Sequence, residues 1–337
     1  RAGSNDCPYL AQWDGLSWQP VGGGTNEIVI ATTVYNNELY IVGDFTQAGD
    51  VPCNYVAKWD GANWHSFGNG LSRETTLHHL FAVCFWNGDL YEGGAAFTPD
   101  AMETCNIARW RNEKWCGLGN GAPYVETMLA DGNNLYVAGP YEFGGIICNG
   151  MAMWDGSQWN KCNNNYQADG SPISLVKYNG CILAGTSSYE SLDILQWDGT
   201  VWQPFNADFQ YDDWWSPQAM INEMMVMGNN LVVAGQFSKI SGEDGGHIAL
   251  WDGASWNTLN GGMGYYEDVY ALTEYNGQLI AAGYFSSAGG VDCNNIARWD
   301  GTQWYPLGTG LDSTVMDMTV FNGDLIRNDR IYGVVQI

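Results

Sequence analysis

Basic residues are scarce in this chain of 337 residues, which has 12 Lys+Arg against 37 Asp+Glu and a formal net charge of −25 at pH 7. Proteins that bind nucleic acid need positive surface charge to release counterions from the phosphates. This composition therefore excludes a nucleic-acid partner. Long apolar runs are also absent, because no stretch approaches the roughly 18 consecutive apolar residues of a transmembrane helix. No transmembrane segment is expected.

Helical periodicity is missing, and charged residues make up only 15% of the chain, whereas coiled coils are rich in Glu, Lys, Ala and Leu. Glycine (44), tryptophan (17) and tyrosine (19) are abundant instead. Disordered chains are poor in aromatic residues, so the composition indicates a folded domain. The chain begins Arg1-Ala2-Gly3 without Met, and we expect a processed product or a fragment of a longer protein.

A pair of tryptophans five residues apart recurs seven times along the chain. In six of the seven pairs the sequence reads Trp-Asp-Gly-x-x-Trp. The exception is the pair that begins Trp110-Arg111-Asn112. The first tryptophans are separated by about 48 residues on average, which lies within the range of propeller blades. The pairs are Trp13/Trp18, Trp59/Trp64, Trp110/Trp115, Trp154/Trp159, Trp197/Trp202, Trp251/Trp256 and Trp299/Trp304.

Each period contains four short apolar runs separated by turn residues. In the sixth period these runs cover residues 269–275, 279–283, 295–299 and 304–307. Asn276-Gly277 favours a tight hairpin turn, and Asp300-Gly301 favours a slightly longer one. Runs of this length that are rich in aromatic and β-branched residues indicate strands. The repeating unit is therefore predicted to be a four-stranded antiparallel sheet with strands a to d.

The two ends of the chain complement one another. Residues 9–21 supply only strands c and d, and residues 315–337 begin with strands a and b. Pairing the ends in one blade closes the ring and removes exposed sheet edges. The sequence thus predicts an all-β, seven-bladed β-propeller that forms a single domain over residues 1–337. Arg327-Asn328-Asp329-Arg330 departs from the other blades, so residues 331–335 are the alternative for the closing strand.

The motifs Asn-Gly-x-Leu, Ala-Gly-x-Phe and Ile-Ala-Arg-Trp-Asp-Gly-x-x-Trp resemble the kelch-related propeller repeats of secreted bacterial surface proteins. Many of those proteins are carried by type IX secretion and bear a C-terminal sorting domain. The resemblance covers nearly the whole chain. It implies an extracellular or cell-surface location, and it implies no particular activity and no catalytic residues.

The repeat itself accounts for most residues that would otherwise suggest a binding site. Fourteen of the 17 tryptophans belong to the pairs, so we interpret them as packing residues rather than as a sugar-binding array. Aspartates of Asp-Gly turns accept hydrogen bonds from backbone N–H groups, so a turn role is expected for them. These aspartates are Asp14, Asp60, Asp155, Asp198, Asp252 and Asp300.

The nine cysteines include no Cys-x-x-Cys motif, and only four histidines are present, which argues against a zinc site. Because nine is odd, at least one cysteine is free or intermolecular. Five of them enter strand c of different blades, too far apart to pair. These are Cys7, Cys53, Cys105, Cys148 and Cys293. We expect most cysteines to be small packing residues, and an intrablade disulfide stays open.

The loops that join strands b to c and d to a vary most, and variable loops on a rigid scaffold carry function. The loop over residues 205–217 contains the only two tryptophans that the repeat does not explain. The candidate ligand-binding residues are Tyr211, Asp212, Asp213, Trp214 and Trp215, together with Tyr265 and Tyr266 from a neighbouring loop. Aromatic platforms beside carboxylates suit a glycan. The alternative is an insertion whose aromatic side chains pack back over the ring.

Two acidic residues stand out in the inner strands. Glu223 and Asp317 occupy a position that holds Ala, Ser or Thr in the other blades, so both should face the central channel. They could share a cation or a water cluster, or form a carboxylate pair for hydrolysis. Solvation in a water-filled channel is the simpler expectation. His78 and His79 precede an inner strand, but adjacent strand residues point to opposite sides, so a shared ligand role is weak.

Calcium is the cofactor that the acidic loops suggest. Glu243-Asp244 and Asp208 with Asp212-Asp213 offer the oxygen ligands that Ca²⁺ prefers. Their spacing does not match a known calcium loop, and a charge of −25 attracts divalent cations diffusely. Calcium binding is therefore left open, and the metal ligands are unknown.

Three functions are compatible with these features. The first is a non-catalytic extracellular or cell-surface adhesion module whose variable loop face contacts a glycan or a surface protein. The second is a structural spacer propeller in a larger extracellular assembly. The third is a polysaccharide hydrolase or lyase that uses the channel carboxylates. Because no Gly-x-Ser-x-Gly, phosphate loop, zinc set or nucleophile–base pair is present, the first two are favoured over an enzyme.

Overall fold

The computed structural model describes residues 7, 9–73, 80–95, 97–98, 106–139, 142–148, 150–162, 170–188, 194–205, 209–210, 219–264 and 267–330. Every regular element in this part of the chain is a β-strand. Among these residues, nothing forms a helix long and apolar enough to cross a membrane.

The main strands form four-stranded antiparallel units, which we call blades and number by the order of their innermost strands. Each blade has the strand order a-b-c-d predicted from the repeat. The first blade contains β3 (Val29–Tyr35), β4 (Glu38–Gly43), β7 (Val56–Trp59) and β8 (Trp64–Ser66). The second contains β10 (Leu80–Trp86), β11 (Asp89–Gly94), β13 (Ile107–Arg111) and β14 (Lys114–Gly117). The third contains β15 (Thr127–Asp131), β16 (Asn134–Ala138), β19 (Met151–Trp154) and β20 (Trp159–Lys161).

The remaining blades repeat this pattern. The fourth contains β21 (Ser171–Tyr178), β22 (Cys181–Ser188), β23 (Ile194–Trp197) and β24 (Trp202–Pro204). The fifth contains β26 (Ala219–Met227), β27 (Asn230–Gln236), β30 (Ile248–Trp251) and β31 (Trp256–Asn257). The sixth contains β32 (Asp268–Tyr275), β33 (Gln278–Tyr284), β36 (Ile296–Trp299) and β37 (Trp304–Pro306). The seventh contains β38 (Thr314–Phe321), β39 (Asp324–Arg330), β1 (Leu10–Trp13) and β2 (Trp18–Pro20).

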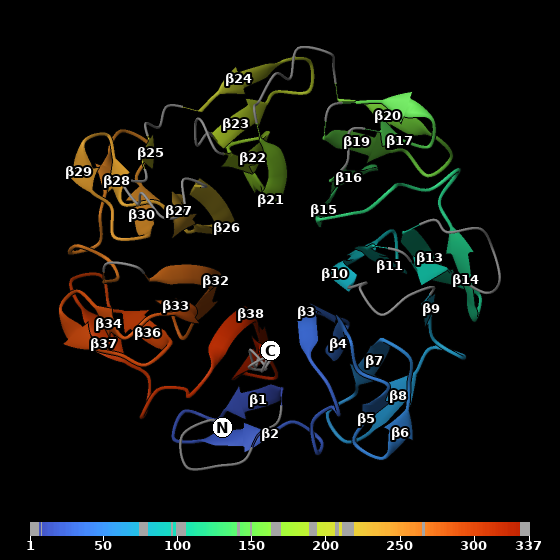
Figure 1. The fold of residues 1–337 in the computed structure, drawn as a ribbon, viewed down its shortest axis with the longest axis horizontal. Helices are drawn as coiled ribbons and strands as arrows, with labels where there is room; N and C mark the ends of the chain where they lie inside the picture. Colours follow the sequence, from blue (N-terminus) through green and yellow to red (C-terminus); the bar gives the residue numbers. More distant parts are fainter. Residues whose placement is uncertain are drawn as a thin grey trace, which may run out of the picture.

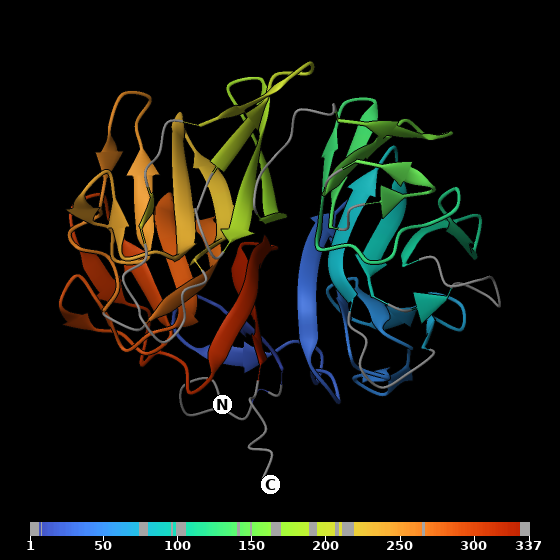
Figure 2. The same ribbon diagram turned by 45° about the horizontal axis from the view of Figure 1, so that its top comes forward.

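The N-terminal and C-terminal strands share the seventh blade (Figures 1 and 2). Strand β1 pairs antiparallel with β39, with Trp13 opposite Leu325 and Leu10 opposite Asn328. The residues Arg327 to Arg330, which depart from the repeat, therefore belong to strand b itself. The alternative closing segment, residues 331–335, lies outside the described residues.

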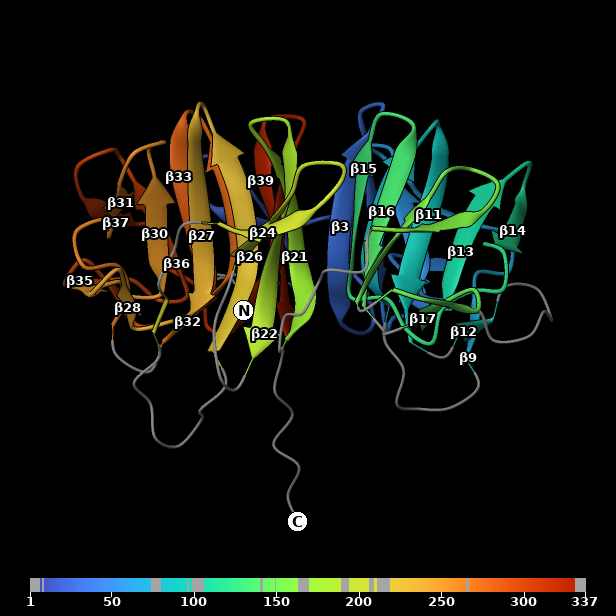
Figure 3. The ribbon, with the colours of Figure 1, turned by 90° about the horizontal axis from the view of Figure 1, so that it is seen from above.

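The innermost strands of the blades surround a common axis (Figure 1), and each contacts the innermost strand of the next blade. The edge-on view in Figure 3 separates two faces. The a–b turns lie along one rim, and the short strands of the b–c connections, including β17 (Glu142–Phe143) and β28 (Lys239–Ile240), lie toward the other. The two predicted loop faces are therefore both present.

Short strands add local detail to this frame. Two-residue hairpins in the b–c connections are β5 (Gln47–Ala48) with β6 (Val51–Pro52), β17 with β18 (Ile146–Ile147), β28 with β29 (Glu243–Asp244), and β34 (Ser287–Ala288) with β35 (Val291–Asp292). In addition, β9 (Ser72–Arg73) pairs with β12 (Phe97–Thr98), and β25 (Phe209–Gln210) pairs with β28. Ser187 and Ser188 of β22 pair with the start of β26, which joins the fourth and fifth blades into one sheet.

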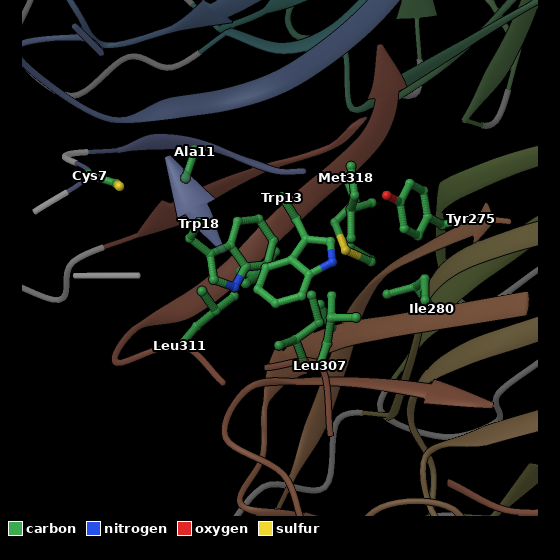
Figure 4. Packing of buried hydrophobic residues seen from close by; sticks show 14 residues of the cluster. Cys7, Ala11, Trp13, Trp18, Tyr275, Ile280, Leu307, Leu311 and Met318 are labelled. Atoms are coloured by element: carbon green, nitrogen blue, oxygen red, sulfur yellow. The ribbon is translucent and has the colours of Figure 1, made fainter. Parts of the chain in front are cut away.

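The apolar core is divided among clusters that lie between neighbouring blades. Figure 4 shows the cluster between the sixth and seventh blades, where Tyr275 and Ile280 meet Met318 and Trp13. Such packing of sheet on sheet buries the large aromatic side chains that dominate core energetics. The two rings of each tryptophan pair lie close together, with centroids between 5.1 and 5.5 Å apart.

The second tryptophan of a pair also ties its blade to the one before. Trp304 Nε1 donates to the carbonyl oxygen of Leu259 at 2.8 Å, and Trp202 Nε1 donates to that of Cys162 at 2.8 Å. Trp64 makes the same bond to Gly22 at 2.9 Å. The repeated tryptophans are thus packing residues of the blade boundaries, as predicted.

Candidate functional site

The residues predicted to bind a ligand lie almost entirely outside the described part of the chain. This applies to Tyr211, Asp212, Asp213, Trp214 and Trp215, and to Tyr265 and Tyr266. His78, His79 and Asp208 also lie outside it. The prediction of a ligand site in these loops therefore stays a prediction.

One part of the long d–a loop packs into the core. Phe209 in β25 is buried, and its ring lies 4.9 Å from that of Phe237 and 5.6 Å from that of Trp256. The pairing of β25 with β28 fixes this position. Phe209 is therefore a packing residue, and the rest of the insertion, residues 206–208 and 211–218, lies outside the described residues.

A polar cluster on the loop face lies next to residues 265–266. The Glu267 carboxylate is buried and accepts hydrogen bonds from the backbone N–H of Gly264 and of Ser286, each at 2.6 Å. Asp268 accepts from Gln236 Nε2 at 2.9 Å and from the Tyr270 hydroxyl at 3.0 Å. These bonds anchor the strand that follows the predicted tyrosine loop.

His247 is buried in the same region. Burial lowers the pKa of its imidazole, and the carboxylates of Asp268 and Glu267 oppose this shift. Its Nδ1 has no hydrogen-bond partner within the described residues. Sequence reasoning gave no role to His247, because a single histidine in the turn before β30 carries no recognisable spacing.

The two predicted channel carboxylates do lie in one cavity. A cavity of about 250 Å³ at the axis is lined by residues of all seven innermost strands, including Glu126, Glu223 and Asp317. In five blades, including that of Glu223, the innermost strand has a register shift immediately before the Glu223 position. In the seventh blade the shift runs from Val315 to Met318 and includes Asp317. A bulge changes the direction in which the next side chains point, and the side chains at the Glu223 and Asp317 position point toward the axis. Both residues line this cavity, and their role there stays a prediction.

Both carboxylates are held by backbone N–H groups of another blade. Asp317 Oδ2 accepts from the Thr32 N–H at 2.6 Å and from its hydroxyl at 2.7 Å. Glu223 Oε2 accepts from the Leu272 N–H at 2.7 Å. Because each N–H belongs to the innermost strand of the following blade, these acids connect blades across the channel wall.

The channel disfavours the charged form of these acids. Burial raises the pKa of Asp317 to about 6, despite the hydrogen bonds from Thr32. Burial also raises the pKa of Glu223 well above its usual value, and the charge of Asp317 adds to this effect. Burial alone raises the pKa of Glu126. The channel therefore holds three acids with a reduced tendency to ionise, and the oxygens of Asp317 and Glu223 already serve as inter-blade acceptors.

The turn aspartates have the opposite environment. Asp300 Oδ1 accepts from the N–H groups of Thr302 and Gln303, at 2.8 and 2.9 Å. These bonds lower the pKa of Asp300 to about 2. The other five turn aspartates make the same pair of bonds, as predicted.

No cation site is evident among the described residues. Glu243 and Asp244, named from the sequence as calcium candidates, are exposed in β29. Within the described ranges, no three His, Cys, Asp or Glu side chains are grouped so that they could hold a metal ion. The structure places no disulfide among the eight described cysteines, and Cys105 lies outside the description.

A groove on the opposite rim was not foreseen from the sequence. It lies between the fifth and sixth blades, has a volume of about 510 Å³, and falls in the size range of small-molecule sites. Its lining includes Met227, Leu250, Trp299, Glu274 and Asp300. The sequence signal that could have revealed it is Met227, which replaces an aromatic residue found at the same place in five other blades.

Comparisons with known proteins concern the fold. Residues 276–299 match the family described as "Domain of unknown function (DUF5122) beta-propeller". The computationally designed Ika8 protein is similar with a TM-score of 0.57 and 14% identity, over 98% of each chain. The Dos1 propeller is similar with a TM-score of 0.52 and 11% identity, over 96% of this chain and 95% of that one.

A third structure is the extracellular domain of BT4673 from B. thetaiotaomicron, with a TM-score of 0.39 and 11% identity, where the match covers 95% of this chain and 53% of that one. No curated protein matches the chain. The antiparallel four-stranded sheets, the family match and the Dos1 propeller together confirm the predicted fold class: the chain is an all-β protein with a β-propeller fold.

Proposed function

We propose that this chain is a non-catalytic extracellular or cell-surface binding module whose variable loop face contacts a glycan or a surface protein. The frame that we propose is a closed ring of seven blades. The pairing of β1 with β39 supports closure, because it leaves no free sheet edge between the first and last strands of the chain. The resemblance to kelch-related repeats of secreted bacterial surface proteins supports the location.

The observation that carries this proposal is the state of the channel carboxylates. An acid–base pair for glycoside hydrolysis needs one ionised carboxylate and one protonated acid beside the substrate. Here Asp317 and Glu223 are occupied as acceptors for Thr32 and Leu272 of neighbouring blades. These contacts favour a structural role for both acids over a hydrolase or lyase mechanism.

The loop face offers better conditions for recognition. Glu267 and Asp268, on the C-terminal side of residues 265–266, accept five hydrogen bonds from main-chain and side-chain donors. Loops that a rigid scaffold holds in place lose little conformational entropy on binding. This anchoring supports a binding role for the loop that carries Tyr265 and Tyr266.

A glycan array with the purified chain tests the proposal, using the double variant Trp214→Ala/Trp215→Ala and measuring with and without EDTA. We expect selective glycan binding that the double variant loses. Leu16→Ala is the matched control, because Leu16 is 88% exposed in a c–d turn of the other rim. A Glu223→Gln variant should bind as well as the unmodified chain.

A folded chain that binds no glycan and captures no surface protein would contradict the binding role and favour the spacer. Turnover of a polysaccharide that Glu223→Gln abolishes would instead establish the hydrolase. Sensitivity to EDTA would add calcium to the binding site.

A further inference from the structure

The last residue of each innermost strand lies at the boundary with the next blade. It pairs with the first residue after the a–b turn, so its place in the blade is fixed by register. These residues are Tyr35, Trp86, Asp131, Tyr178, Met227, Tyr275 and Phe321. Five are aromatic, and Asp131 and Met227 are the two that differ.

The aromatic residues fill their boundaries. Tyr35 stacks on Phe85 of the second blade, with ring centroids 4.0 Å apart. Trp86 Nε1 donates to the Gly132 carbonyl of the third blade at 3.0 Å. Tyr275 is buried against Met318 of the seventh blade (Figure 4). Each ring thus reaches the following blade and excludes solvent there.

The boundary between the third and fourth blades uses an ion pair instead. Lys177 Nζ lies 2.5 Å from Asp131 Oδ1. Lys177 stands opposite Ile182, which stands opposite Trp197, so these three residues share one row across the fourth blade. The Lys177 ammonium of the fourth blade therefore neutralises the Asp131 carboxylate of the third blade.

The boundary between the fifth and sixth blades has neither arrangement. Glu274 stands opposite Leu279, which stands opposite Trp299, so Glu274 occupies the place that Lys177 has in the fourth blade. Met227 of the fifth blade holds the place that Asp131 has in the third blade, and its thioether is uncharged. Within the described residues, the Glu274 carboxylate has no ion pair or hydrogen bond.

This mismatch leaves the groove of about 510 Å³ open between the two blades. Trp299, Leu250 and Leu259 provide apolar surface within it, and Glu274 and Asp300 provide carboxylates. Strands β26, β27, β30 and β31 of the fifth blade supply one side, and β32 and β36 of the sixth blade supply the other. These two blades are neighbours in the ring of strands (Figure 1). The groove therefore combines an apolar wall with negative charge.

The charge of the groove selects the class of occupant. Asp300 stays ionised because its turn lowers its pKa to about 2. No Lys, Arg or His is among the residues that line the groove, and the chain as a whole carries a charge of −25. Such a site attracts cations, and the methylene stem of a lysine packs well on aromatic and apolar side chains.

We propose that this groove binds a lysine side chain of a partner protein, with the ammonium at Glu274 and the stem along Trp299 and Met227. The model for this contact is Lys177 on Asp131, which the chain itself uses two blades earlier. Asn257 adds a donor, since its side-chain oxygen accepts from the Leu259 N–H at 2.8 Å and its amide N–H groups stay available for a partner carbonyl. Because the groove lies on the rim opposite the variable loops, this inference does not depend on glycan binding there.

Calorimetric titration with the peptide acetyl-Gly-Lys-Gly-amide tests the inference. We expect saturable binding that weakens at high salt, and at least a tenfold loss of affinity for Glu274→Gln. We expect no binding for Met227→Trp, because its indole would fill the groove as Trp86 fills the equivalent boundary of the second blade. The same peptide with an acetylated lysine should not bind. Glu243→Gln is the matched control, because it removes one exposed carboxylate from the opposite rim.

Glu274 is exposed, so Glu274→Gln should fold even if Met227→Trp does not. Equal affinity of Glu274→Gln and the unmodified chain, equal binding of the acetylated peptide, or no binding at millimolar peptide would each overturn the inference. Tighter binding of glucosamine than of the lysine peptide would also overturn it, because it would identify an amino sugar as the ligand.

Discussion

Asp317 accepts hydrogen bonds from both the backbone N–H and the hydroxyl of Thr32, a residue 285 positions earlier in the chain. The contact joins the innermost strand of the seventh blade to that of the first. Together with the pairing of β1 and β39, it connects the two ends of the chain through both the channel wall and the sheet.

Replacing Asp317 by alanine should destabilise the chain by about 1–3 kcal/mol, because it leaves the Thr32 N–H without its acceptor in the channel. Thr32→Val removes only the hydroxyl bond and should cost about 0.5–1.5 kcal/mol. Urea unfolding followed by tryptophan fluorescence measures both. Equal stability of Asp317→Ala and the unmodified chain would show that water replaces the carboxylate without loss.

The same residue predicts a dependence on pH. The pKa of Asp317 is about 6 in the folded chain and about 3.9 in an unfolded one, so the folded state binds the proton more tightly between these values. Stability should therefore fall as pH rises from about 4 to above 6, by up to about 3 kcal/mol. In Asp317→Asn this part of the slope should vanish. An unchanged slope in that variant would assign the dependence to other acids.

Glu92 should limit the stability of the fold. It is fully buried between the first and second blades, and neither carboxylate oxygen has a hydrogen-bond partner in the described structure. Burial raises its pKa well above the usual value. Because Ile41 and Val137 hold the equivalent place in the neighbouring blades, Glu92→Leu should raise the unfolding free energy at pH 7 by about 1–3 kcal/mol.

Urea unfolding at pH 5 and pH 8 measures the effect of Glu92→Leu. The gain should be larger at pH 8, because the buried carboxylate is then under stronger pressure to ionise. Glu274→Gln, an exposed carboxylate change, serves as the control and should leave stability within about 0.5 kcal/mol. A loss of stability in Glu92→Leu would mean that the carboxylate satisfies a group not seen in the described residues.

Trp304 represents the repeated packing role of the second tryptophan. It is 1% exposed and donates to the Leu259 carbonyl at 2.8 Å. Trp304→Ala should cost about 3–5 kcal/mol through the cavity it leaves. Trp304→Phe keeps most of the ring volume but loses the bond, so about 1–3 kcal/mol is expected. Similar losses in both variants would show that the hydrogen bond, rather than the packing, dominates.

The cysteines should behave as protected thiols. Burial raises the pKa of Cys53, Cys148 and Cys293 to about 11, and that of Cys84 and Cys162 to about 12. Because the thiolate is the reactive form, these groups should react slowly with a disulfide reagent in the folded chain. Denaturant without reductant should expose at least the eight thiols that the structure describes. A smaller number would reveal a disulfide.

Most of the blade architecture could be predicted because its signals are local. Trp299 and Trp304 lie five residues apart, and the turn between them is fixed by hydrogen bonds from Asp300 to Thr302 and Gln303. Strand d of the sixth blade ends at Pro306, one residue before the predicted end. These patterns depend on hydrogen bonds and spacings between residues that are close in the sequence, so they can be recognised from the sequence alone.

The candidate sites were only partly predictable. The sequence predicts a channel position for Glu223 and Asp317 because they interrupt a column of small residues, but that column does not indicate their acceptor roles toward Leu272 and Thr32. Phe209 belongs to the loop that the sequence predicts to bind a ligand, and it pairs with Ile240 in β28, which is distant in the sequence. The role of such residues depends on which strands meet, which local patterns do not specify.

The sequence by itself determined the four-stranded repeat, the tryptophan pairs and the aspartate turns, because each follows from hydrogen bonds and periodicity within one blade. Only the tertiary structure decided which boundaries between blades are filled by side chains, and that the boundary between the fifth and sixth blades holds a groove. Met227 and Glu274 are ordinary residues in their own strands, and the groove between them exists because two blades place a thioether opposite an unpaired carboxylate. That complementarity belongs to neither strand alone.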